Sequence, residues 1–454
     1  MKFGIIRAGK SRLSTVVVAA LAILPANAPA QAPGAAMPNL DARTRAAIVD
    51  SVTAALAEVY VFPDVAAQMD EQVRKQLRSG AYDGAKTHPD FAEQLTRDLQ
   101  AISHDKHLRV RAMHPSQFGE TGRAVPDAER LRHDREAMAR DNYGFRKVEI
   151  LPGNIGYLRL DGFMDASQAG ATAVAALGFL AHCDAIVIDL RHNGGGSPSM
   201  VQFITSYFFD EPKHLNSFYI RRTDETEQFW TSAYVEGRRL TDVDLWVLTS
   251  ARTFSAAEEF CYNLKNMERA TLVGETTGGG AHPVEMRGFP SLGIAMSLPF
   301  GRAINPITKT NWEGTGVTPH LAVPAAQALD VAQTKALEKL RGRATDPGRI
   351  AELDWLVSDA EARRNPVQVD GTRLARYAGQ YEDRTIQARG AELFYRRGDR
   401  PEMRMVPMSE TLFRFDETDR MRLEVVCDVD GKPLKLVGHY ADGRTDESLR
   451  SAGR

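Results

Sequence analysis

A serine stands where an expected strand passes into an expected helix. The apolar run DLWVLTS (244–250) is typical of a buried strand, and a helical pattern continues from RTFSAAEEF (252–260) through CYNLKNM. Ser255 therefore falls at a helix N-terminus, where a serine commonly caps free backbone N–H groups. The same position suits a nucleophile, because the helix dipole favours negative charge there and a tight turn exposes the hydroxyl.

A nucleophilic serine requires a general base. Lys265 lies ten residues after Ser255, about 15 Å along a helix, and is too distant. The base would therefore be one of the 11 histidines, and residue type alone does not select among them.

The chemistry also requires donors for an oxyanion. The N–H of Ala256, just after the serine, is one candidate. A second lies in RHNGGG (191–196), which follows the apolar strand DAIVIDL, since glycines can turn bare N–H groups toward a ligand. A tight turn or a phosphate cradle would also use glycines, but the G-x-x-x-x-G-K-[ST] and G-x-G-x-x-G patterns of nucleotide sites are absent.

Three apolar helix faces precede these motifs and predict a small helical domain over residues 40–115. Pro63 is expected to stop the first helix and Asp64 to cap the second, and the third begins near Thr87. Residues 116–147 are highly charged and contain one polar helix, typical of a solvated connector; a lid over the site is the alternative.

Residues 148–335 alternate apolar strands with helices, which predicts an α/β core. The strands are expected at 148–160, 184–190, 215–222, 244–250, 270–274 and 293–300. Residues 336–364 are expected to be a helical linker. Short strands and the Asp430-Gly431 turn predict a small β domain over 365–454.

The N-terminus has the pattern of a secretory signal peptide. Basic residues come first, STVVVAALAIL (14–24) is too short to span a bilayer, and the small-x-small site APA (28–30) follows. We therefore expect residues 1–30 to be removed and the protein to be periplasmic or secreted, with no stable membrane anchor after cleavage. An N-terminal anchor is the alternative.

Composition narrows the class of protein. The 454 residues carry a formal net charge of −2, which argues against a nucleic-acid partner. Cys183, Cys261 and Cys427 fit no zinc motif, and the sequence does not select a disulfide pair among them.

Taken in order, the motifs resemble those of the C-terminal processing (tail-specific) serine peptidase family. They are GNIGYLRL, DAIVIDLRHNGGG, TSARTFSAAEEF, VGETTGGGAHP and NWEGTGVTPH, after a short histidine motif. The resemblance covers about residues 40–335 and is greatest to the branch of the interphotoreceptor retinoid-binding protein repeats, with the tricorn protease core as a more distant relative. It implies a crotonase-like β/α spiral core.

The resemblance also implies roles. Ser255 would be the nucleophile, His107 in HDKHLRV the general base, and Glu313 in NWEGTGV the acid that orients the histidine. Gly194 or Gly195, with Ala256, would form the oxyanion hole. No metal or organic cofactor is implied.

The sequence departs from the tail-specific proteases at two places. Those enzymes use a Ser–Lys dyad, but glycine stands near Gly279 where the lysine would be, so a Ser–His–Glu triad is favoured. They also carry a PDZ domain of roughly 90 residues, for which the stretch of about 35 residues after the histidine motif is too short.

The prediction is an exported serine peptidase that cleaves peptide or protein substrates through an acyl-enzyme. A non-catalytic binder of hydrophobic ligands on the same scaffold is the alternative, and a scaffold acting through residues 365–454 is a third possibility. His107 is preferred to His104 only through the motif match, and His282 is the reserve candidate for the base, or a substrate contact. Glu313 could instead pair with Arg302. Arg191 and Asn193 are expected to brace the glycine loop.

Overall fold

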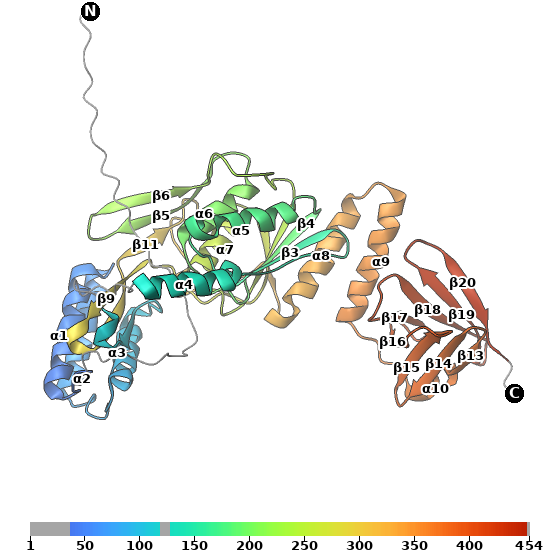
Figure 1. Ribbon diagram of the computed structural model, residues 1–454, viewed down its shortest axis with the longest axis horizontal. Helices are drawn as coiled ribbons and strands as arrows, with labels where there is room; N and C mark the ends of the chain where they lie inside the picture. The colour runs from blue at the N-terminus through green and yellow to red at the C-terminus, as the bar shows by residue number, and fades with distance from the viewer. Residues whose placement is uncertain (1–36, 119–127, 452–454) are drawn as a thin grey trace, which may run out of the picture.

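The computed structural model describes residues 37–118 and 128–451. Figure 1 shows an elongated molecule with helices at the N-terminal end, an α/β core in the middle and a β domain at the other end. The expected signal peptide, residues 1–30, lies outside the described part. Among the described helices, none combines the length and the apolar character needed to cross a bilayer.

Three helices build the N-terminal part: α1 (Ala42–Val59), α2 (Pro63–Arg78) and α3 (His88–Ser103). Their apolar faces pack in one buried cluster with residues of strands β1 (Arg109–Ala112) and β10 (Ile294–Pro299). Pro63 is the first residue of α2 and Phe62 its N-cap, so Asp64 lies in the first turn and is not the expected cap. Proline is favoured there because its missing N–H would have no helical partner.

The centre of the core is a six-stranded sheet in the order β12-β8-β7-β4-β3-β2. All neighbours are parallel except β2 and β3. Its strands are β2 (Phe145–Leu151), β3 (Ile155–Leu160), β4 (Ala185–Asp189), β7 (Asp244–Thr249), β8 (Ala270–Gly274) and β12 (Leu321–Ala322). The middle strands β4 and β7 are buried along their whole length, which explains their continuous apolar sequences.

Helices cover both faces of this sheet. Side chains of α5 (Ala166–Phe179), α6 (Pro198–Thr205) and α7 (Ala256–Asn266) pack in one apolar cluster. Helices α8 (Ala328–Arg343) and α9 (Pro347–Arg364) contribute to the cluster on the opposite face. The segment expected to be a linker therefore also covers the sheet.

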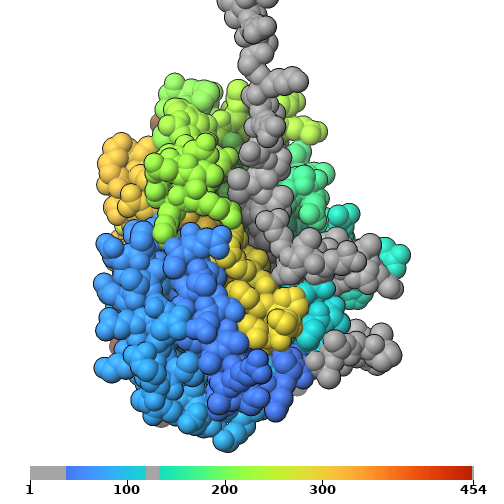
Figure 2. All heavy atoms as spheres, turned by 90° about the vertical axis from the view of Figure 1, so that its left-hand side faces the viewer, coloured from blue at the N-terminus to red at the C-terminus, as the bar shows by residue number. Residues whose placement is uncertain are grey.

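Two smaller sheets flank the core, in the orders β1-β10-β9 and β11-β5-β6. Their remaining strands are β5 (His214–Ile220), β6 (Glu225–Trp230), β9 (Val284–Phe289) and β11 (Gly301–Ile304). In Figure 2 the yellow chain segment that includes β9 lies beside the blue N-terminal helices. The first sheet joins the N-terminal helices to the core, because β1 follows α3 and pairs with β10.

Helix α4 (Ala128–Arg140) lies in the charged connector. After α9 come α10 (Gly371–Tyr377) and an antiparallel eight-stranded sheet, whose strands follow one another in chain order. They are β13 (Gly379–Tyr381), β14 (Arg384–Arg389), β15 (Glu392–Arg397), β16 (Met403–Pro407), β17 (Leu412–Phe415), β18 (Met421–Cys427), β19 (Pro433–Tyr440) and β20 (Thr445–Leu449). A bridge between Tyr381 and Arg450 brings the first and last strands together.

The topology places three loops at one edge of the central sheet. Strands β4, β7 and β8 are parallel neighbours, so their carboxyl ends meet. The glycine loop 191–196, the turn 250–255 and the glycine loop 275–280 follow these ends. Open α/β sheets bind ligands at such edges.

Candidate active site

The backbone of Ser255 is strained. Its φ of 56° and ψ of −121° lie outside the extended region that an ordinary N-cap residue adopts. A non-glycine residue with positive φ costs free energy and persists where the surrounding structure holds it, commonly at functional sites. The sharp turn from β7 into α7 thus resembles a nucleophile elbow more than a simple helix cap.

Glu258 holds this turn in place. Its carboxylate accepts the backbone N–H of Ser255 at 2.9 Å, and also the N–H groups of Gly279 at 2.6 Å and Gly280 at 2.8 Å. The Thr277 hydroxyl donates to it as well, at 2.5 Å. Burial raises the pKa of Glu258, although these donors act to lower it. Sequence reasoning missed this residue; the Ser-x-x-Glu capping pattern was its signal.

Ser255 lies in the wall of a pocket with a cavity volume of about 170 Å³. Among the expected site residues, His107, Gly194 and Ala256 line the same pocket. Much of the rest of the wall is apolar, from Pro198, Phe218, Phe254, Ala281, Pro283, Val284 and Trp312. The structure thus brings together residues that lie about 150 positions apart in the sequence.

His107 enters the pocket from the loop between α3 and β1. Its backbone N–H donates to Asp105 Oδ1 at 3.0 Å, and its ring packs on Phe254 with a centroid distance of 4.7 Å. Burial lowers the pKa of His107 to about 4. The negative charge of Asp105 acts to raise it, and the positive charges of His282 and Arg109 act to lower it. The imidazole is therefore neutral at pH 7, which is the form that a general base requires.

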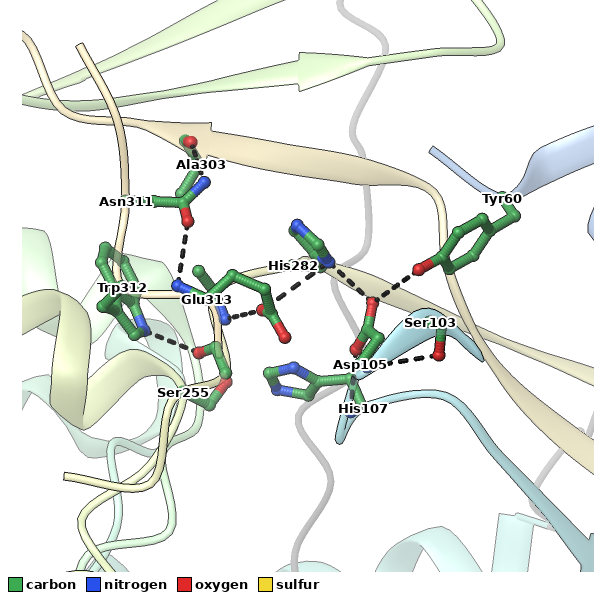
Figure 3. A network of polar contacts seen from close by, with 12 residues as sticks. Tyr60, Ser103, Asp105, His107, Ser255, His282, Ala303, Asn311, Trp312 and Glu313 are labelled. Carbon is green, nitrogen blue, oxygen red and sulfur yellow. Dashed lines mark hydrogen bonds and ion pairs between the residues drawn. The ribbon is translucent and has the colours of Figure 1, made fainter. Parts of the chain in front are cut away.

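Glu313 lies beside this imidazole (Figure 3). Its Oε2 accepts the N–H of Ala281 at 2.5 Å, whereas its buried Oε1 and the buried His107 Nδ1 have no hydrogen-bond partner among the described residues. One side-chain nitrogen or oxygen atom from each of Asp105, His107 and Glu313 lies within 4.8 Å of the other two. Burial, and then the charge of Asp105, raise the pKa of Glu313. These three atoms are close enough together to bind one metal ion, a role that the sequence did not imply.

Asp105 is a second acid that sequence reasoning gave no role, although it belongs to the D-x-H motif. It is fully buried and lies 2.6 Å from His282 Nδ1, with the Tyr60 hydroxyl donating to it at 3.4 Å. His282 also lies 3.6 Å from Glu313. Burial acts to lower the pKa of His282, but the bond to Asp105 and the two negative charges raise it overall. In Figure 3, Asp105 and Glu313 lie between His282 and His107.

The expected oxyanion donors differ in their surroundings. The N–H of Gly195 already donates to Asn193 Oδ1 at 2.9 Å. A Cβ on Gly195 would lie 2.7 Å from that of Ser255, so this position requires glycine for close approach. Gly194 is exposed and lines the pocket, as Ala256 does. The geometry therefore favours the N–H groups of Gly194 and Ala256.

Two polar side chains brace this loop, as expected. Asn193 also donates to the carbonyl of Leu160 at 2.9 Å. Arg191 pairs with Asp189 at 2.7 Å and donates to the carbonyl of Ala325 at 2.7 Å. Neither side chain lines the pocket.

The other candidate groups lie elsewhere. His104 is exposed at the C-terminal end of α3, and Lys265 donates to the carbonyl of Thr318 at 2.6 Å. Gly279 has a φ of +81°, and a Cβ there would lie 3.0 Å from the nitrogen of Gly316, so the fold does not accept a lysine at this position. Arg302 lies over the ring of Tyr219. Cys183, Cys261 and Cys427 are unpaired, and the first two are buried.

Two family models match this chain. The model of peptidase family S41 matches residues 154–323, and a model described as the N-terminal domain of that family in eukaryotic IRBP matches residues 36–152.

Several solved structures are similar. Mature CPAF complexed with lactacystin has 12% sequence identity and a TM-score of 0.45, covering 66% of this chain and 97% of that chain. The photosystem II D1 C-terminal processing protease has 14% identity and a TM-score of 0.39, covering 62% and 93%. The tricorn protease has 13% identity and a TM-score of 0.42, covering 70% and 37%.

Proposed function

The chain belongs to peptidase family S41, and we propose that it hydrolyses peptide bonds of peptide or protein substrates through Ser255. The family resemblance read from the motifs is confirmed. So is the fold class, a crotonase-like α/β core between an N-terminal helical bundle and a small C-terminal β domain. The observation that carries the proposal is the strained backbone of Ser255 in a pocket that it shares with a neutral, buried imidazole.

In the proposed reaction, Ser255 Oγ attacks the peptide carbonyl while His107 takes its proton. Glu313 stabilises the imidazolium that forms, and the N–H groups of Gly194 and Ala256 receive the negative charge on the carbonyl oxygen. His107 then protonates the leaving amine. Water, activated by the same imidazole, releases the acyl group from Ser255. His282, which contacts both Asp105 and Glu313, holds these two carboxyl groups beside His107.

We also propose that the protein is exported through the signal peptide of residues 1–30. Support comes from the basic start, the short apolar run and the APA site. N-terminal sequencing of the mature protein from the periplasm or the medium should give a start at Gln31. An intact N-terminus in the membrane fraction would support the anchor instead.

The apolar pocket wall favours one second candidate. Phe218, Phe254 and Trp312 would suit a hydrophobic ligand in a protein that performs no chemistry. Such a binder would not need an acid pair beside a buried histidine, so the peptidase is the better supported function.

Digestion of an unfolded protein, reduced and alkylated casein, separates the two. The intact protein should produce fragments in mass spectrometry, Ser255→Ala should produce none, and Ser79→Ala, at an exposed position after α2, should match the intact protein. Equal cleavage by all three would refute the role of Ser255. No cleavage by any, together with saturable binding of a fluorescent fatty acid, would favour the binding protein.

A further inference from the structure

Three basic side chains line one side of the pocket. They are Lys106, Arg109 and Arg111, from the segment that carries His107 and runs into β1. Arg109 and Arg111 are two residues apart on a strand, so their side chains leave the same face. This segment therefore presents two guanidinium groups to the pocket, next to the proposed general base.

These two arginines have no counter-ion among the described residues. Arg109 Nε donates to the carbonyl of Lys106 at 3.2 Å, which fixes the side chain and leaves its terminal nitrogens for other partners. Burial lowers the pKa of Arg111, and the charge of Arg109 lowers it further. By contrast, Arg74, outside the pocket, pairs with both Asp50 and Asp70.

We propose that Arg109 and Arg111 form a subsite that binds a carboxylate of the peptide substrate beside Ser255. The inference rests on the proposed peptidase function, which it makes more specific. Guanidinium groups bind carboxylates through paired, charge-assisted hydrogen bonds. The carboxylate belongs to an aspartate or glutamate side chain of the substrate, or to its C-terminus.

The remaining lining is consistent with one carboxylate at this side only. Phe218 and Val284 offer apolar walls to neighbouring substrate residues. A bound carboxylate would also offset the positive charge of Arg109 near His107. An acidic substrate would thereby make the imidazole a stronger base, which couples recognition to catalysis.

Paired peptides test the subsite. A quenched fluorescent peptide of casein sequence is synthesised with Asp, Glu, Asn or Gln at each position in turn, and with a free or amidated C-terminus. Values of kcat/KM are measured for the intact protein, for Arg109→Gln/Arg111→Gln and for the control Arg78→Gln/Arg97→Gln. The control removes the same charge from the exposed surface of α2 and α3. Thermal unfolding verifies that each variant folds.

The intact protein and the control should prefer the acid over the matched amide at one position, about tenfold or more, as for one charge-assisted hydrogen bond. In Arg109→Gln/Arg111→Gln the ratio should fall to about 1. A preference confined to the free C-terminus would identify the terminal carboxylate as the ligand. No preference for any acid, or one that survives in the double variant, would overturn the inference.

Binding to Ser255→Ala separates this inference from the peptidase function. Fluorescence anisotropy of the same peptides needs no cleavage. Arginine-dependent binding of the acidic peptide, without cleavage by the intact protein, would keep the subsite and refute the peptidase. Cleavage without any effect of the arginines on binding or rate would keep the peptidase and refute the subsite.

Discussion

Glu258 binds the backbone of Ser255, with its Oε2 accepting the Ser255 N–H at 2.9 Å. The same carboxylate receives the N–H groups of Gly279 and Gly280, so one side chain joins the nucleophile turn to the glycine loop. The strained conformation of Ser255 is thus imposed by a buried acceptor that is itself fully bonded.

Replacing Glu258 by alanine should therefore damage stability and activity together. Three N–H groups, two of them buried, would lose their acceptor, which costs on the order of 3 kcal/mol in the free energy of unfolding. Urea unfolding followed by tryptophan fluorescence measures this loss, with Glu93→Ala on the exposed face of α3 as the control. A variant as stable and as active as the control would show that Glu258 does not hold the turn.

Ser255→Gly should be more stable than Ser255→Ala. Alanine keeps the strain of a positive φ, whereas glycine adopts such a conformation without steric cost. We expect the glycine variant to be more stable by about 1 kcal/mol in urea unfolding, and both variants to be inactive. Equal stabilities would mean that the turn is not strained.

The pH dependence of kcat/KM should report the carboxyl group of Glu313. Its pKa is raised to about 7, while that of His107 is lowered to about 4. Between these values the imidazole is already neutral and the acid still protonated, so activity should rise with pH through about 7 as Glu313 ionises.

Glu313→Gln removes the titrating carboxyl group, so the rise of kcat/KM through about pH 7 should disappear. The remaining activity should be lower by on the order of 10²–10⁴-fold, because the imidazolium would lose one of the two carboxylates beside it. If kcat/KM of this variant still rises near pH 7, the titration belongs to another group.

Glu259 should make the folded protein less stable at high pH. Burial raises its pKa to about 7, so the folded state binds this proton more tightly than the unfolded state. The stabilisation is fully present below about pH 4.5 and is lost as the pH rises through about 7. Between pH 5 and pH 8 the intact protein should lose on the order of 3 kcal/mol more stability than Glu259→Gln. Parallel losses in the two proteins would contradict the assignment.

Much of the fold follows from local sequence. Strand β7 and helix α7 are predicted by a continuous apolar run followed by a helical pattern, and these two elements alone place Ser255 at a turn. The half-exposed strands β6 and β9 lack such a signal and were missed. Helix α8 was read as part of a linker, because its small buried residues, such as Ala332 and Ala336, give a weak apolar stripe.

The site is harder to predict, because its parts are distant in the sequence. His107 and Ser255 share a pocket only because β1 pairs with β10 and the loops after β4, β7 and β8 meet. No local pattern encodes this pairing, so only the family resemblance pointed to His107. Asp105 was missed because its significance depends on His282, which lies 177 positions away.

Covalent labelling of Ser255 tests the central claim most directly. The intact protein is treated with a fluorophosphonate, and the adduct is located by peptide mass spectrometry. We expect one phosphonyl group on Ser255, none on Ser255→Ala, and labelling of His107→Gln slower by at least about 100-fold, since the general base would be lost. No adduct on Ser255, or labelling of His107→Gln at the same rate as the intact protein, would contradict the proposed mechanism.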